Sequence, residues 1–297
     1  MDYLNIHIDG TAFGANVESK PRPEDLAASG AVSGVPGAPS STDTTQRVAD
    51  LLAERRRAAT KRYEEAVFRV LVAISHQRSG RAVIAEVRRS GKQVTIVPYL
   101  PSDQDWENAS ARPVSVEDAT RRHRRPRDSD GDPIEEVRRG TGRGSDSEIE
   151  FIPKDLATSI NSHTAVKVKS AWTPGHDPYS LAFEDELLLH ELVHSFRQAA
   201  GQSNRRRVPR QPRYDTMEEL VAITVTNVYR SECHRPGVRN DNHGKLELMF
   251  CSGEHFLKLQ FNRIHLWKFC RQHPILARDL GSIDTYFNPF QHLRAAN

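Results

Sequence analysis

The sequence predicts a mainly helical α+β domain with a small β-sheet, and two patterns support this fold class. Apolar residues recur at helical spacing over long stretches, notably 45–77 and 180–200, whereas the alternation typical of strands is confined to short stretches such as 148–152. No apolar run approaches the ~18 residues needed to cross a bilayer, so we expect no membrane-spanning segment. The three cysteines form no C-x-x-C pair, which argues against a disulfide framework.

The 297-residue chain divides into a polar N-terminal segment and one large domain. We expect residues 1–45 to be disordered, because Gly, Ala, Ser, Pro and Thr dominate the stretch 28–45. They lack the basic region and apolar stretch of a Sec signal peptide. The segment is therefore either a disordered terminus or an export segment for another secretion route. Residues 46–297 are expected to form the folded domain.

Two helices and a strand open the predicted domain. The first helix is expected over 45–77, capped by Thr44 or Thr45, and a Ser-Gly pair is expected to end it. A short helix over 81–89 follows. The next stretch, 93–99, is β-branched and carries a proline near its end, which predicts a strand.

The middle and end of the domain differ in composition. Residues 101–147 are polar and broken by Gly and Pro, which predicts a flexible insertion, and 148–152 alternates like a strand. A helix is expected to begin near residue 178 or 180 and to end at Gly201. Apolar residues at helical spacing over 254–297 predict a C-terminal helical cover.

The predicted helix that ends at Gly201 contains the pattern His190-Glu191-x-x-His194. Positions i and i+4 share one face of a helix, so both imidazoles can reach one metal ion. Glu191 lies beside them, where it can take a proton from a metal-bound water. Zinc lowers the pKa of such a water to roughly 7, which makes a hydroxide nucleophile available at neutral pH.

A catalytic zinc site usually has three protein ligands, and the stretch MEEL supplies two candidates for the third. With Thr216 as the helix N-cap, Glu219 becomes the capping-box residue and Glu218 is free for the metal. With Asp215 as the N-cap, the two roles are reversed. The stretch 221–226 also alternates like a strand. A metal ligand at Glu218 or Glu219 requires a helix, so we predict a helix for this segment.

A protease also needs a donor for the oxyanion of its tetrahedral intermediate. Tyr229 and His243 have the right side-chain types and follow the candidate ligands in the chain. We therefore name both as candidates, although a core role for Tyr229 and a loop role for His243 are the ordinary alternatives.

The segments LLHELVHSFRQAAG and MEELVAI together resemble the zinc-protease effectors of the NleD type secreted by Gram-negative pathogens. They are also distantly similar to the light chains of clostridial neurotoxins, whose HELIH helix is followed by an EEL segment. GTGRGSDSEIEFIP resembles the strand that precedes the catalytic helix in the effector group. The similarity covers about residues 80–245.

This resemblance implies a zincin-like metalloprotease domain with one zinc ion per chain. In the neurotoxin light chains the first Glu of the EEL segment binds the zinc, which carries over to Glu218. The resemblance further implies export by a type III-like route, without a Sec signal peptide, and a protein substrate in the host cytosol.

We therefore expect a zinc-dependent endopeptidase, a bacterial effector or toxin whose substrate enters along an edge strand near 148–152. The alternative is a non-catalytic binding protein whose Arg-rich stretches, 121–127 and 205–213, hold an acidic partner or nucleic acid. Such binding would be strongly salt-dependent and would survive metal removal. No aromatic residues are interleaved with the first basic stretch, which makes nucleic acid the weaker choice of partner.

Overall fold

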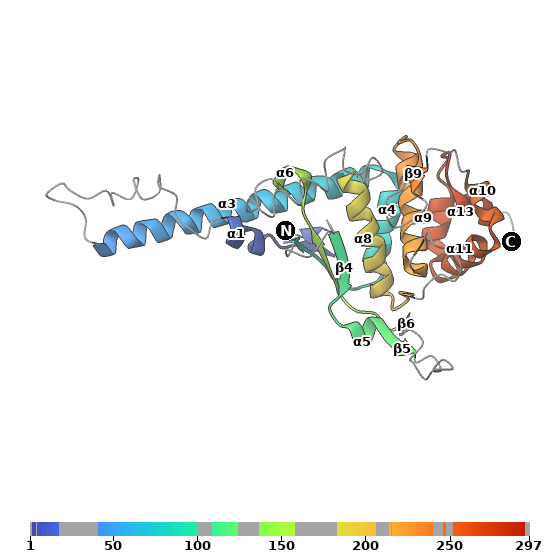
Figure 1. The fold of residues 1–297 in the computed structure, drawn as a ribbon, viewed down its shortest axis with the longest axis horizontal. Helices are drawn as coiled ribbons and strands as arrows, with labels where there is room; N and C mark the ends of the chain where they lie inside the picture. The colour runs from blue at the N-terminus through green and yellow to red at the C-terminus, as the bar shows by residue number, and fades with distance from the viewer. Residues whose placement is uncertain are drawn as a thin grey trace, which may run out of the picture.

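The protein is mostly helical with a small main sheet, as the sequence predicts, and Figure 1 shows that sheet on one side of α8 and helices α9 to α13 on the other. A computed structural model describes residues 2–3, 5–17, 41–99, 109–123, 137–157, 183–205, 214, 216–239, 246–247 and 252–294. The strands are β1 (Asp2–Tyr3), β2 (Ile6–Ile8), β3 (Val94–Pro98), β4 (Ala109–Pro113), β5 (Thr120–His123), β6 (Val137–Gly140), β7 (Ser147–Phe151), β8 (Val238–Arg239) and β9 (Leu246–Glu247). The helices are α1 (Thr11–Val17), α3 (Ser41–His76), α4 (Arg78–Arg89), α5 (Val116–Ala119), α6 (Lys154–Ala157), α8 (Glu184–Ala199), α9 (Met217–Glu232), α10 (Gly253–Lys258), α11 (Gln260–Gln272), α12 (Pro274–Gly281) and α13 (Pro289–Arg294).

The main sheet has five strands in the order β1-β2-β3-β7-β4. The three central strands are parallel, whereas β1 and β4 pair antiparallel at the two edges. Both β3 and β7 alternate in burial, so one face of the sheet joins the core. The predicted strand over 148–152 is present as β7, but it is an interior strand, so the expected edge position is wrong. The edge strand beside it is β4, which tolerates Pro113 because an edge needs fewer backbone donors.

The N-terminal residues contribute to the fold, which corrects the prediction of disorder over 1–45 for residues 2–3, 5–17 and 41–45. Ile6 and Ile8 of β2 are fully buried, and β2 pairs in parallel with β3. Helix α1 packs against α3. A three-residue strand leaves almost no periodic signal, because its stability comes from pairing with a distant strand rather than from local preference. Residues 18–40 lie outside the described part of the chain.

Much of the predicted flexible insertion, 101–147, also forms regular structure, so that prediction is wrong for residues 109–123 and 137–147. Strand β4 completes the sheet, and β5 and β6 form a separate antiparallel pair. The polar composition reflects edge and hairpin positions with one solvated face rather than a lack of structure. The remaining insertion residues lie outside the described chain.

The Gly-rich loop that follows β6 closes the C-terminal end of α8. The Gly142 N–H donates to the Gly201 carbonyl at 2.8 Å. Gly201 has φ +61°, which confirms its predicted role as the residue that stops the helix. Gly144 lies so close that a Cβ there would be 1.7 Å from the Ala199 carbonyl oxygen. The glycines therefore let two backbone segments meet where any side chain would separate them.

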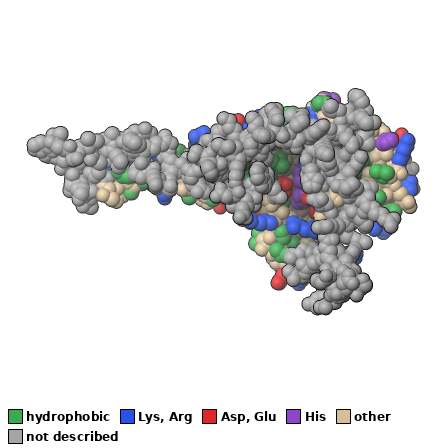
Figure 2. All heavy atoms as spheres, viewed as in Figure 1, with side chains coloured by type: hydrophobic (Ala, Val, Ile, Leu, Met, Phe, Trp, Pro, Cys, Tyr) green, Lys and Arg blue, Asp and Glu red, His purple; other side chains and the backbone are tan. Residues whose placement is uncertain are grey.

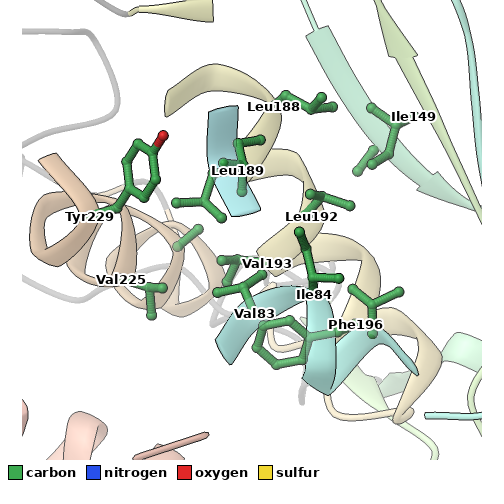
Figure 3. Packing of buried hydrophobic residues seen from close by; sticks show 14 of the residues in the cluster. Val83, Ile84, Ile149, Leu188, Leu189, Leu192, Val193, Phe196, Val225 and Tyr229 are labelled. Carbon is green, nitrogen blue, oxygen red and sulfur yellow. The ribbon is translucent and has the colours of Figure 1, made fainter. Parts of the chain in front are cut away.

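Helix α8 is the centre of the core and contacts α3, α4, α9 and the sheet. Its apolar residues lie between α4, α9 and β7, as Figure 3 shows. The fully buried members on α8 are Leu188, Leu189, Leu192, Val193 and Phe196. Because this helix is covered on several sides, its polar residues are held in fixed positions.

The junction of α3 and α4 departs from the predicted boundary. Helix α4 already begins at Arg78, because the Glu232 carboxylate accepts hydrogen bonds from the N–H groups of Arg78 and Ser79 at 2.7 and 2.9 Å. The predicted stop, Gly80, lies inside the first turn of α4. A Cβ there would be 2.0 Å from the Ile74 carbonyl oxygen, so the glycine permits a tight turn between two helices.

The predicted C-terminal cover is present as α10 to α13, which pack on one another and through α11 and α12 on α9 and α4. Leu266, Leu276 and Phe287 are fully buried there. None of the described helices is long and apolar enough to span a membrane.

Candidate metal centre

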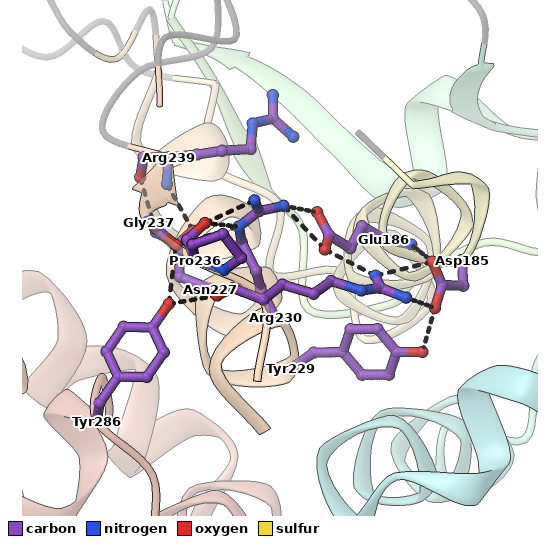
Figure 4. A network of polar contacts seen from close by, with 10 residues as sticks. Asp185, Glu186, Asn227, Tyr229, Arg230, Pro236, Gly237, Arg239 and Tyr286 are labelled. Carbon is purple, nitrogen blue, oxygen red and sulfur yellow. Dashed lines mark hydrogen bonds and ion pairs between the residues drawn. The ribbon is translucent and has the colours of Figure 1, made fainter. Parts of the chain in front are cut away.

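The first turn of α8 is anchored by a buried ionic network (Figure 4). Both Glu186 oxygens accept hydrogen bonds from Arg230 of α9, at 3.0 and 2.9 Å. Arg235 bridges Asp185 and Glu186, each at 2.7 Å. Burial raises the pKa of Glu186 even though both arginines act to lower it. The network joins the start of α8 to the end of α9 and so fixes how α8 is rotated.

The His190-Glu191-x-x-His194 pattern lies in the middle of α8, as predicted. His190, Glu191 and His194 are 6%, 7% and 8% exposed, and their ligand-type atoms lie within 4.8 Å of one another, so the group could hold a metal ion. The two histidine Nε2 atoms face each other at 3.0 Å. Figure 2 shows histidine and acidic side chains inside a hollow on the face in view. The side chains of His190, Glu191 and His194 are thus largely buried.

Glu219 of α9 completes this group of side chains. Its Oε2 lies 3.2 Å from His190 Nε2, and its Oε1 lies 3.2 Å from His194 Nε2. The Glu219 carboxylate, which comes from a second helix, therefore contacts the Nε2 atoms of both histidines. This is the position expected of a third ligand.

Glu218 has other partners in the described structure, so its role as the metal ligand stays a prediction. Its Oε1 accepts a hydrogen bond from Arg197 Nε at 2.8 Å, and its Oε2 accepts one from the Asn204 N–H at 2.8 Å. It lies 3.6 Å from Nδ1 of His194, the ring nitrogen that faces away from the metal position. Glu218 therefore supports His194 from behind rather than facing the metal position.

Local contacts separate the two glutamates that the sequence left as alternatives. Thr216 is the N-cap of α9, and its side chain accepts a hydrogen bond from the Glu219 N–H at 3.3 Å. That cap was expected to occupy the Glu219 carboxylate and free Glu218. Instead, buried Arg197 requires a carboxylate partner, and Glu218 supplies it. The Glu219 side chain is then left to face the histidines.

The electrostatic field at the centre favours positive charge. Burial acts to lower the pKa of His194, but the carboxylates of Glu219 and Glu218 outweigh it and raise that pKa well above its usual value. Burial acts to raise the pKa of Glu218, but Arg197 and His194 lower it to about 2. The pKa of Glu219 is likewise lowered by both histidines against the effect of burial. A site with these preferences would also stabilise a metal cation.

Of the two predicted oxyanion donors, only Tyr229 lies among the described residues, and its hydroxyl is engaged elsewhere. The Tyr229 hydroxyl donates to Asp185 at 2.7 Å, and the ring is 1% exposed in the core. Burial beside Asp185 raises the pKa of Tyr229 strongly, which suits a structural hydroxyl. His243 lies outside the described residues, so its role stays a prediction.

Arg197 and Asn204 are the site residues that the sequence argument missed. Neither residue was among the predicted site residues. A usable signal for Arg197 was its position three residues after His194, on the same side of the helix. The Asn204 contact is made by its backbone N–H, for which the side-chain type gives no signal.

Comparisons with protein-family models, with curated proteins and with solved structures found no match to this chain. The family resemblance drawn from the sequence motifs therefore stays a prediction.

Proposed function

We propose that the protein is a zinc-dependent endopeptidase. The observation that carries this proposal is the close approach of two imidazoles and one carboxylate, with the histidine Nε2 atoms 3.0 Å apart, His190 Nε2 3.2 Å from Glu219 Oε2 and His194 Nε2 3.2 Å from Glu219 Oε1. Ligands at ~2.0–2.1 Å from a tetrahedral zinc are themselves about 3.3 Å apart. The spacing of these atoms is close to that value. One zinc ion per chain would be held by His190, His194 and Glu219.

Glu191 has the position required of a general base. It follows the first histidine on α8 and lies within the same buried group. A zinc ion bound there would supply Lewis acidity and a water with a pKa near ~7. Glu191 would take the proton from that water and later deliver it to the leaving amine.

The edge strand β4 is the place we propose for a peptide substrate, replacing the expected position on β7. The Gln198 side chain of α8 donates to the Ala111 carbonyl at 3.1 Å, which shows that this carbonyl points away from the sheet and toward the catalytic helix. A peptide added beside β4 by backbone pairing would lie next to α8. Export by a type III-like route and a protein substrate in a host cytosol remain part of the proposal through the motif resemblance alone.

Zinc content and cleavage test this function together. Purified protein should contain about one zinc per chain, and His190→Ala should lose it. Glu191→Ala should keep the zinc and lower cleavage by at least about a thousandfold. Terminal-labelling proteomics on a host-cell lysate, comparing the natural chain with Glu191→Ala, would reveal the cleaved proteins. Glu184→Ala, on the same helix but outside the centre, is the control.

Two outcomes would overturn the mechanism. Zinc that remains bound after His190→Ala would place the metal elsewhere. Proteolysis that survives Glu191→Ala would remove that residue as the base.

A further inference from the structure

A second polar cavity lies beside the metal centre, on the far side of the Arg197–Glu218 pair. Its volume is about 370 Å³, within the usual range of small-ligand sites. Its described lining comes from the end of β6 and the loop after it, from residues 201–204 after α8, from the first turns of α9 and from one side of α11. Arg139, Arg197 and Lys268 line it, and no described Asp or Glu does. The cavity is therefore positively charged.

Three polar atoms without partners among the described residues belong to side chains that line this cavity. Arg197 Nη1, Gln202 Oε1 and Ser203 Oγ are buried and have no hydrogen-bond partner among the described residues. Arg197 is 3% exposed and Ser203 is 1% exposed, so bulk water does not satisfy them. Leaving such a group unpaired costs ~1–3 kcal/mol. Two of these atoms are donors, and one belongs to a guanidinium, which suits an anionic ligand.

The strand pairing next to the cavity brings like charges together. Arg139, which lines the cavity, is the direct cross-strand partner of Arg121 in the β5–β6 hairpin. Both side chains are exposed, and like charges directly opposite each other destabilise a sheet. The nearby Asp118 lies 3.7 Å from Arg143, which already engages that carboxylate. Figure 1 shows this hairpin near the C-terminal end of α8. An anion at the cavity would relieve the repulsion.

We propose that this cavity binds a small phosphate-bearing molecule. Arginine and lysine at its opening match the charge of a phosphate, and arginine can contact two phosphate oxygens at once. Ser203 and Arg197, two of the lining residues, carry buried donor atoms that have no partner among the described residues. A carboxylate ligand would use fewer of these donors, because it has two oxygens rather than the three or more of a phosphate. This binding site is separate from the proposed protease centre and does not depend on it.

Calorimetric titration of the full chain with sodium pyrophosphate at about 150 mM salt tests the site. The His190→Ala variant is used alongside the natural chain, so that phosphate binding to a metal cannot account for the signal. We expect one pyrophosphate per chain with a Kd below about 1 mM in both proteins. Arg139→Ala, Lys268→Ala and Ser203→Ala should each weaken binding by at least about tenfold, the usual effect of losing a charged hydrogen bond. Arg263→Ala, an exposed cation of α11 that does not line the cavity, should change the Kd by less than about twofold.

Three results would overturn the proposal. One is the absence of saturable heat with pyrophosphate. Another is an equal loss of affinity in Arg263→Ala, which would show attraction to general surface charge. The third is unchanged affinity in the folded Arg139→Ala and Lys268→Ala proteins. Both of those side chains are exposed, so circular dichroism should confirm that the variants fold.

Discussion

Glu218 and Glu219 are neighbours in the chain but serve different partners, because a helix turns by about 100° between successive residues. That rotation directs Glu219 toward His190 and His194, and Glu218 toward Arg197. The arrangement gives His194 a carboxylate on each side of its ring. Second partners of this kind hold a metal-binding imidazole in one orientation.

This division predicts different effects for two conservative substitutions. Glu219→Gln should weaken zinc binding by more than about a hundredfold, because a ligand loses its charge. Glu218→Gln should keep a stoichiometry of one zinc and weaken binding by about ten- to a hundredfold, the usual effect of losing a ligand's hydrogen-bond partner. Competition with a chromophoric chelator measures both affinities. Zinc bound normally in Glu219→Gln but absent from Glu218→Gln would restore Glu218 as the ligand.

At the scale of elements, helices were easier to predict than strands. The apolar stripe of α8 and its stop at Gly201 predicted the body and the end of that helix, because periodicity and a glycine are local signals, whereas its start at Glu184 is later than the predicted 178 or 180. Strand β2 was not predicted, because its stability comes from pairing with β3, which lies far along the chain. The capping residue of α9 was among the predicted alternatives, but the direction of its glutamates depended on Arg197 from another helix.

The ionic network between α8 and α9 is predicted to act as a single unit. Glu186→Gln alone should lower the free energy of unfolding by about 3–5 kcal/mol, because it leaves Arg230 buried with a weakened partner. Replacing both, as Glu186→Gln with Arg230→Met, should cost less than the sum of the two single changes. Urea denaturation of all four proteins measures this coupling. Strict additivity would show that the two side chains contribute independently.

At the scale of the whole molecule, the C-terminal cover is tied to α4 by a buried pair. His273 Nδ1 lies 2.7 Å from Glu86 Oε1. Burial acts to raise the pKa of Glu86, but His273 and Arg89 hold it below its ordinary value of 4.5. Burial also lowers the pKa of His273 below 6.5, and this outweighs the opposing effect of Glu86.

Both shifts predict that acid loosens the cover. A lowered carboxyl pKa stabilises the fold above about pH 4.5, and this stabilisation is lost as the pH falls through the folded-state value. A lowered histidine pKa acts in the same direction, because the unfolded chain binds the proton more readily below about pH 6.5. Glu86→Gln should lower the free energy of unfolding at pH 7 by about 1–3 kcal/mol and flatten its decline toward pH 4.

Urea unfolding at several pH values checks this expectation. Glu65→Gln is the matched control, because Glu65 belongs to an exposed pair with Lys61 on α3. An equal flattening in both variants would assign the pH dependence to general surface charge.

The bond between Glu232 and the start of α4 also has a consequence for how the chain folds. It joins residues 153 positions apart, so closing it requires α9 to be made and docked first. Until then the first N–H groups of α4 have no cap, and the junction of α3 and α4 is held only by its local turn. We therefore expect this junction to become rigid late in folding, after the long helix and the sheet have formed. During synthesis on the ribosome, the candidate metal centre and the α3–α4 junction would be completed together.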